Sequence, residues 1–246
     1  PAPAPAPAPG AAANCVNTQL AVTVGTVSRI NYQYIGPING TAVSVSTVRP
    51  LTTYEGQSVY EQFSTVEVTG TTTAGGFSSQ IVNKTEGSSY YNRQSATELP
   101  LHGSFFTNSS RTTLFGITSD AVSTVKTVIN PPFTDPRFGL AVGQSASLTY
   151  PSTSTVTILQ PSGQPPTTTT VQAKFNVRFV GIESVTVPAG TYSTCRFEQV
   201  DPDSPNNTTT QWYSVNQGVA VKQVSVTPEG TQTLNATLVQ INGTNY

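Results

Sequence analysis

The chain contains one histidine, His102, and this is the first residue to consider for catalysis because a hydrolase triad needs a base beside its nucleophile. His102 follows Pro100 in a predicted turn. The segment 143–147 (Gly-Gln-Ser-Ala-Ser) lacks the final glycine of a nucleophile elbow. We expect His102 to be a surface-loop residue, and a polar cleft around it would be needed to support an enzyme. The sequence therefore predicts no catalytic residue.

Metal binding has few candidate residues. One histidine and two distant cysteines cannot supply a zinc tetrad. Asp201 and Asp203, followed by Asn206 and Asn207, offer oxygen ligands for weak calcium binding, but the closing glutamate of an EF-hand is missing. We expect an Asx-rich turn here and predict no metal site.

Carboxylate pairs and glycine-rich phosphate-binding loops are two further features that could support a catalytic or cofactor site. Glu55, Glu61 and Glu67 lie six residues apart and offer carboxylates for glycoside cleavage, but no motif brings a second carboxylate to them. Gly75-Gly76 is not followed by a helical pattern, as a phosphate-binding loop requires. The sequence predicts no cofactor site.

Aromatic residues have two interpretations. They could line an apolar or sugar-binding pocket, or they could form cross-strand pairs in a core, which is the structure we expect. The residues concerned are Tyr32, Tyr34, Tyr60, Phe63, Tyr90 and Tyr91. We expect the single tryptophan, Trp212, to be a buried core anchor.

The clearest structural pattern begins at Ala173. Apolar residues at positions 173, 175, 177 and 179 alternate with polar ones, which predicts a strand with one buried face. The alternation slips at Gly181, as it does at a β-bulge. The segment Pro188-Ala189-Gly190 predicts a tight turn into a second strand. Three more strands, separated by short turns, complete an antiparallel meander that ends at Ile241.

Upstream of this meander, alternating runs are separated by glycine and proline, at the spacing of an all-β protein. These runs are 20–35, 41–48, 58–68, 77–84, 88–93, 111–117, 121–129, 145–150 and 154–159. We predict an all-β fold of roughly a dozen strands, built as a curled antiparallel sheet, a half-barrel or a sandwich. Residues 15–246 would form one domain, with an internal division near 130–137, where three prolines mark an irregular crossing.

The C-terminal meander resembles a loosely defined group of proteobacterial secreted and lipoprotein domains, most of unknown function. The resemblance rests on the run Val185–Tyr192 (VTVPAGTY) with Glu183 before it, on Cys195, on Trp212-Tyr213, and on the run Gly218–Lys222 with Leu238. It implies a curled antiparallel sheet or half-barrel in the cell envelope or outside the cell. It implies no catalytic residue.

Composition narrows the classes of function. Only 9% of the 246 residues are charged, against about 25% in ordinary globular proteins, and the net charge is −1. No basic stripe is present to neutralise phosphates, so nucleic acid is not an expected partner. No apolar run approaches the roughly 20 residues of a membrane-spanning helix.

The two cysteines, Cys15 and Cys195, predict a disulfide and an oxidising compartment. In the chain-entropy model, closing so long a loop stabilises a protein by roughly 5 kcal/mol. The bond would attach the start of the domain to the second strand of the 188–190 hairpin.

Residues 1–14 are predicted to be an extended arm or linker. Pro1, Pro3, Pro5, Pro7 and Pro9 alternate with alanine, which favours a polyproline II segment about 28 Å long. A signal peptide upstream is expected, and a lipid anchor there is left open. The arm could bind a neighbouring subunit or act only as a spacer.

Two non-enzymatic functions follow. In the first, the protein is a structural subunit of an extracellular or cell-surface filament-like assembly that self-associates through its N-terminal arm. In the second, it is an outer-membrane-anchored or periplasmic lipoprotein whose half-barrel binds an apolar ligand. Both place the protein in the outer envelope or outside the cell.

Overall fold

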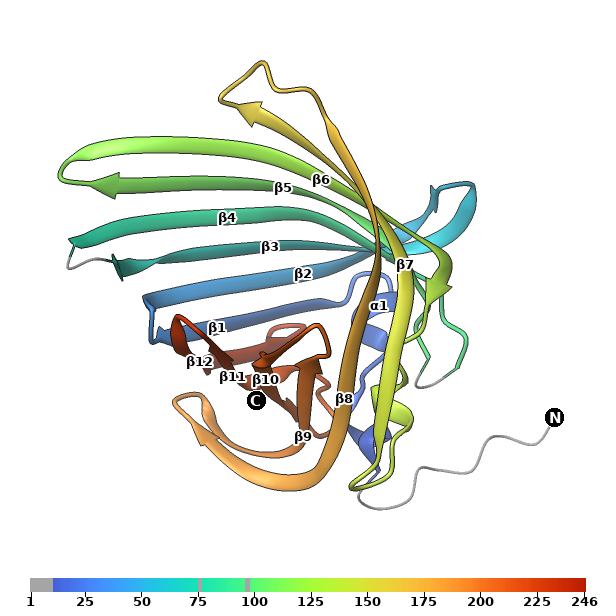
Figure 1. The fold of residues 1–246 in the computed structure, drawn as a ribbon. Coiled ribbons are helices and arrows are strands. Elements are labelled where there is room, and N and C mark those ends of the chain that lie inside the picture. Colours follow the sequence, from blue (N-terminus) through green and yellow to red (C-terminus); the bar gives the residue numbers. More distant parts are fainter. Residues whose placement is uncertain (1–10, 75–76, 96–97) are drawn as a thin grey trace.

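The structure is a computed structural model, and it describes residues 11–74, 77–95 and 98–246. Its strands form one antiparallel sheet in which each strand pairs with its neighbours in chain order, so the all-β prediction is confirmed (Figure 1). The strands are β1 (Val27–Ile35), β2 (Ile38–Tyr54), β3 (Gln57–Ala74), β4 (Phe77–Tyr91), β5 (Leu101–Leu114), β6 (Ile117–Phe133), β7 (Ser145–Gln160), β8 (Thr167–Val187), β9 (Gly190–Asp201), β10 (Ser204–Ser214), β11 (Ala220–Thr227), β12 (Gly230–Ile241) and the short β13 (Thr244–Asn245).

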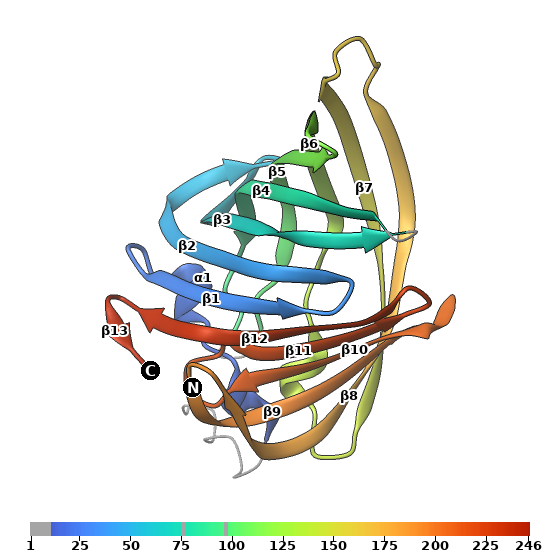
Figure 2. The same ribbon diagram turned by 90° about the vertical axis from the view of Figure 1, so that its left-hand side faces the viewer.

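The sheet closes into a twelve-strand antiparallel barrel because β1 pairs with β12, from Ser28 opposite Ile241 to Ile35 opposite Thr233. The view in Figure 2 shows these two strands side by side. The predicted half-barrel or sandwich is therefore wrong. Alternation along a strand indicates which face is buried, but it carries no information on whether the first strand reaches the last. Closure leaves β1 and β12 without a free edge.

The meander β8–β12 agrees with its sequence pattern. Val177 and Phe179 are buried on the inner face of β8, and the ladder between β8 and β9 shifts register between Phe179 and Gly181, as predicted. Gly181 has a φ of +150°, which favours glycine. Val187 pairs with Gly190 across the predicted turn.

Most strands upstream are longer than their sequence patterns indicated, but the run 111–117, predicted as one strand, contains the turn between β5 and β6 at Phe115-Gly116. The runs 77–84 and 88–93 belong to one strand, β4, which continues through Gly87. A Cβ atom at Gly87 would lie 2.0 Å from the carbonyl oxygen of Phe105 and 2.8 Å from Cδ1 of Phe106, so the glycine makes room for the backbone of β5 and for this ring. In the same way β7 continues through Pro151 and joins the runs 145–150 and 154–159. Glycine and proline therefore do not end these strands as expected.

The N-terminal plug, which we define as residues 11–22, differs from the predicted strand over 20–35. It contains η1 (Ala12–Cys15) and the short helix α1 (Gln19–Val22), and the strand begins only at Val27. Ala12, Cys15 and Ala21 are buried against the barrel. The helix α1 thus lies against β2 and β3, and η1 lies against β9.

Cys15 and Cys195 form the predicted disulfide, which joins the plug to β9 across a sequence separation of 180. The bond lies in a buried cluster with Phe179, Phe197 and Leu148. A disulfide of this kind indicates that the protein is exported from the reducing cytosol.

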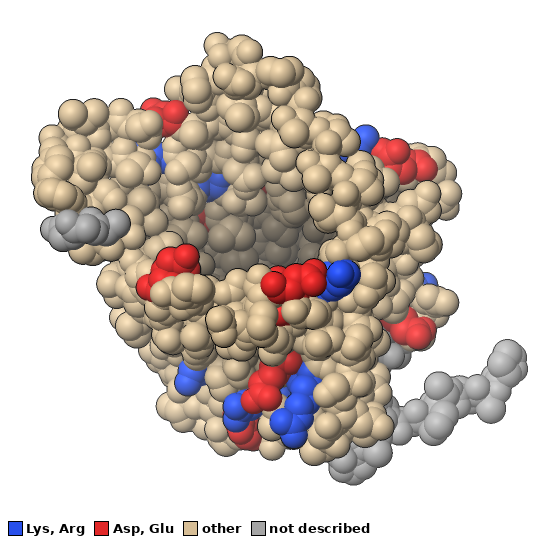
Figure 3. Space-filling model, viewed as in Figure 1, with Lys and Arg blue, Asp and Glu red and all other residues tan. Residues whose placement is uncertain are grey.

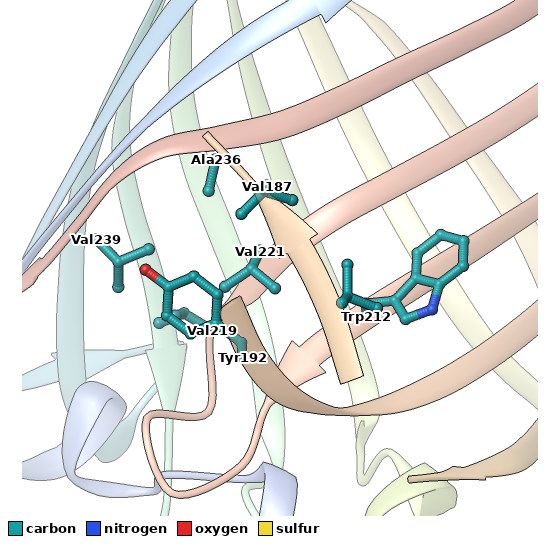
Figure 4. Packing of buried hydrophobic residues seen from close by; sticks show 8 residues of the cluster. Val187, Tyr192, Trp212, Val219, Val221, Ala236 and Val239 are labelled. Carbon is teal, nitrogen blue, oxygen red and sulfur yellow. The ribbon is translucent and has the colours of Figure 1, made fainter. Parts of the chain in front are cut away.

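A second buried cluster contains Trp212, which is 9% exposed, as expected for a core anchor. Figure 4 shows it with Val187 and Tyr192 of the β8–β9 hairpin and Val221 of β11. The indole N–H of Trp212 donates to the Glu183 carboxylate at 2.5 Å.

The proposed assembly arm, with Pro1, Pro3, Pro5, Pro7 and Pro9, lies outside the described residues, as does Gly75-Gly76. The predicted division near 130–137 corresponds to the end of β6 and the beginning of η2 (Pro136–Gly139). Among the described residues, none of the helices has the length and apolar character needed to cross a membrane.

Candidate functional site: a cavity behind the N-terminal plug

His102 lies in the strand β5, not in a turn, and its Nε2 is 3.0 Å from the amide nitrogen of Asn92. Burial lowers the pKa of His102, which favours the neutral imidazole. Its surroundings include Arg93, Pro132 and Thr134. This environment gives the imidazole an amide partner, which is not the nucleophile or orienting carboxylate of a triad.

The three glutamates of the sequence analysis are not brought together. Glu55 forms an ion pair with Lys126 at 2.6 Å, and Glu61 forms one with Arg49 at 3.0 Å. Glu67 belongs to the same face of β3 as Glu61 and pairs in the ladder with Lys84 of β4. Glu61 thus binds a cation on the neighbouring strand β2, and Glu55, in the turn between β2 and β3, binds one on β6.

The acidic segment after β9 forms the expected Asx turn. The Asp201 carboxylate accepts a hydrogen bond from the backbone N–H of Asp203 at 2.9 Å, and Asp203 lies 3.5 Å from Lys174. In residues 11–74, 77–95 and 98–246, no group of three or more His, Cys, Asp or Glu side chains is placed to hold a metal ion.

A cavity of about 440 Å³ lies between the N-terminal plug and the barrel wall. Its lining comes from the plug, from strands β1, β3, β4, β5, β6, β10 and β11, and from the segments before β5, β7 and β11. The residues are Val16, Asn17, Leu20, Ala21, Ser28, Ile30, Gln62, Tyr91, Leu99, Leu101, Phe133, Asp135, Phe138, Tyr213, Gly218, Val219 and Ala220. Most of these side chains are apolar, and the volume is in the range of small-molecule sites.

The plug is held at one end of this cavity by specific polar contacts. The Gln62 side chain donates from Nε2 to the carbonyl oxygen of Leu20 at 2.5 Å. The backbone N–H of Asn216 donates to the carbonyl oxygen of Asn14 at 2.8 Å. Gly218 allows the close approach, because a Cβ atom there would lie 2.4 Å from the backbone nitrogen of Asn17. The cavity is therefore bounded by a fixed segment of the chain.

Asp135 is the charged residue among those that line the cavity. Its carboxylate lies 2.6 Å from Nε of Arg137, a residue that is 8% exposed. The Arg137 guanidinium also donates to the side-chain oxygens of Gln211, at 2.9 Å, and Gln199, at 3.5 Å. Because the ion pair neutralises Asp135, the described residues that line the cavity offer no unpaired charge to a ligand.

Two tyrosines add hydroxyl groups to the cavity. Burial raises the pKa of Tyr91 and of Tyr213, so both phenols stay neutral at physiological pH. The neighbouring Tyr32 hydroxyl donates to the carbonyl oxygen of Ala220 at 2.7 Å and holds the start of β11 against β1. Of the six aromatic residues considered in the sequence, Tyr91 lines the cavity, whereas Tyr90 stacks on Tyr54 with ring centroids 4.0 Å apart.

The inner wall beyond the cavity carries uncharged polar pairs in register across neighbouring strands. Ser46 and Ser64 lie 2.8 Å apart, and the Thr85 hydroxyl donates to the Asn108 amide oxygen at 2.9 Å. Further pairs are Ser110 with Asn83 and Thr127 with Ser154. Figure 3 shows a deep hollow on one face of the molecule, with mostly uncharged walls and charged residues around it. The inner wall at these pairs is thus polar without being charged.

Sequence reasoning missed the cavity because residues 11–14 were assigned to the extended arm and residues 20–22 to a strand, whereas Ala12–Cys15 is a 3-10 helix with Ala12 buried. Leu20 and Ala21 were counted in the strand pattern over 20–35, and nothing local in the sequence indicated that they would lie inside a closed barrel. The useful signal was the disulfide, which requires the residues around Cys15 to lie beside β9.

Comparisons with known proteins assign the chain to no family. No protein-family model matches the chain, and no curated protein matches it. A solved structure of a protein with a YmcC-like fold from Bacteroides fragilis NCTC 9343 is similar at 12% identity and a TM-score of 0.37, over 88% of this chain and 96% of that one. The resemblance to proteobacterial secreted and lipoprotein domains stays a prediction.

Proposed function

We propose that the protein is a non-enzymatic binding protein of the cell envelope that carries an uncharged, mainly apolar small molecule in its barrel. The observation that carries this proposal is the 440 Å³ cavity with its apolar lining and neutralised carboxylate. An acyl chain or a compact apolar ring system of neutral charge suits this lining. The hollow in Figure 3 would be the route by which the ligand reaches it.

Several features of the site support a binding role in place of catalysis. The phenols of Tyr91 and Tyr213 and the amide of Asn17 can orient one polar end of a ligand by hydrogen bonds. Hydrolytic enzymes usually contain a general acid or base with a pKa near neutrality. The pKa values of Tyr91 and Tyr213 are instead raised, further away from that range.

The filament-subunit hypothesis rests on the arm, Pro1–Pro9, and remains a prediction from the sequence. The same holds for a lipid anchor upstream and for a location at the cell surface or outside the cell. The binding function does not depend on any of them.

The experiment fills the cavity by replacing a small residue of its lining with a large one. Ser28 lines it from the inner face of β1, while its neighbour Val27 is on the outer face and 37% exposed. We expect the neutral fluorescent probe N-phenyl-1-naphthylamine to bind the wild-type protein at one saturable site. Ser28→Trp should weaken this binding at least tenfold, because the indole occupies the cavity, and the matched control Val27→Trp should bind as wild type does.

Thermal unfolding of both variants shows whether they are folded, and Ser28→Leu replaces Ser28→Trp if the larger side chain destabilises the barrel. Equal binding by the folded cavity variant and the wild type would show that the probe binds elsewhere and would overturn the proposal.

A further inference from the structure

The ends of the β3–β4 and β5–β6 hairpins carry exposed apolar side chains that the barrel does not use. Phe115 is 75% exposed, Ile117 is 76% exposed and Phe77 is 57% exposed. The rings of Phe77 and Phe115 contact each other edge to face with centroids 5.3 Å apart, so the two hairpin ends lie side by side. Figure 1 shows both at the same extremity of the sheet. We call Phe77, Leu114, Phe115 and Ile117 the apolar tip.

The backbone at Phe115 makes this exposure unusual. Phe115 and Gly116 form a two-residue turn with φ values of 50° and 78°. Asparagine or aspartate ordinarily fills the first of these positions, because a large side chain is disfavoured there. Two other turns of the barrel have the same backbone, and they place polar residues at this position, Glu55 and Asn242. Folding alone therefore favours a polar residue where the chain has phenylalanine.

The surroundings of the apolar tip are uncharged. Residues 112–119 and 71–80 contain no Asp, Glu, Lys or Arg. The first charges below the tip on β5 and β6 are Arg111 and Asp120, which neutralise each other through two hydrogen bonds of 2.8 and 3.1 Å. A convex, uncharged apolar tip of this kind can enter the acyl region of a bilayer directly. A protein partner would instead need a groove complementary to the tip.

We propose that the apolar tip anchors this end of the barrel on the surface of a lipid bilayer by shallow insertion of Phe115, Ile117 and Phe77. The absence of free cations near the tip in the described residues means that the attraction is apolar and not directed at anionic headgroups. Binding is therefore expected on neutral lipid and at high salt. This inference does not depend on the ligand in the barrel.

The experiment is flotation of the protein with phosphatidylcholine vesicles. We expect the wild type to float with the vesicles to the same extent from about 0.05 to 0.5 M salt, where a headgroup interaction would be screened. The double variant Phe115→Asn/Ile117→Ser should lose roughly tenfold or more of this binding, since two apolar side chains no longer enter the lipid. Asparagine tolerates the backbone at position 115, so the variant should fold.

The matched control is Val142→Ser, which removes an apolar side chain that is 59% exposed in the loop before β7. It should float like the wild type. Equal loss in this control, or flotation that depends on anionic lipid, would overturn the proposal. Analytical sedimentation supplies one more contradicting outcome. If the wild type forms dimers and Phe115→Asn/Ile117→Ser is monomeric, the tip binds a second copy of the chain and the proposal is overturned.

Discussion

At the scale of single residues, the packing of buried tyrosines makes the stability of the fold depend on pH. The Tyr54 hydroxyl donates to the carbonyl oxygen of Thr127 at 2.6 Å, and its ring covers Gly103, where a Cβ atom would lie 2.8 Å from this hydroxyl. Burial, with smaller contributions from Glu55 and Tyr90, raises the pKa of Tyr54 to about 12. In the unfolded chain the phenol titrates near pH 10.

The folded state therefore holds the proton of Tyr54 more tightly than the unfolded chain does. Its contribution to stability is complete below about pH 10 and is lost as the pH rises toward about 12. We expect Tyr54→Phe to be destabilised by about 1 kcal/mol at pH 7 through the lost hydrogen bond. Between these two pH values its stability should fall less steeply than that of the wild type.

Urea unfolding at several alkaline pH values measures this difference. Tyr246→Phe, at a residue that is 48% exposed, provides the control for removal of a phenol. Parallel pH curves for Tyr54→Phe and the wild type would contradict the interpretation.

At the scale of elements, the N-terminal plug depends on one covalent bond and a few hydrogen bonds. The variant Cys15→Ser/Cys195→Ser should lose about 2–5 kcal/mol of stability. It should also exchange the backbone amides of the plug faster, because only contacts such as that of Gln62 with Leu20 then hold the segment.

Hydrogen exchange of native protein gives the result element by element, with β5 in the same sample as an internal reference. Unchanged protection of residues 12–22 in the double variant would mean that packing alone holds the plug and that the disulfide has no role in forming the cavity.

Elements also show what the sequence could predict. The β8–β9 hairpin was predictable because the alternation, Gly181 and the turn at Pro188 all act locally. Gly87 and Pro151 were wrongly predicted to end strands. The backbone and a ring of β5 pack closely against Gly87, and Pro151 is accommodated within β7, and neither effect is visible in a local pattern. The turn at Phe115 carries no turn signal other than Gly116.

At the scale of the whole molecule, barrel closure and the cavity depend on contacts between the two ends of the chain. The β1–β12 ladder joins residues about 200 positions apart, and local periodicity does not encode such pairing. The plug then fills one end of the closed barrel and leaves a space beside it. The disulfide was the one long-range contact that the residue types predicted, since two cysteines allow a single pairing.

The most direct test of the binding function is methyl NMR of the isotope-labelled protein during titration with N-phenyl-1-naphthylamine. We expect intermolecular nuclear Overhauser effects from the probe to the methyl groups of Leu20, Ile30, Leu101 and Val219, which line the cavity from four different segments of the chain. The methyl groups of Ile35, on the outer face of β1, should be unaffected. Contacts confined to outer-face methyl groups or to the apolar tip would contradict the account, because the cavity would then not be the binding site.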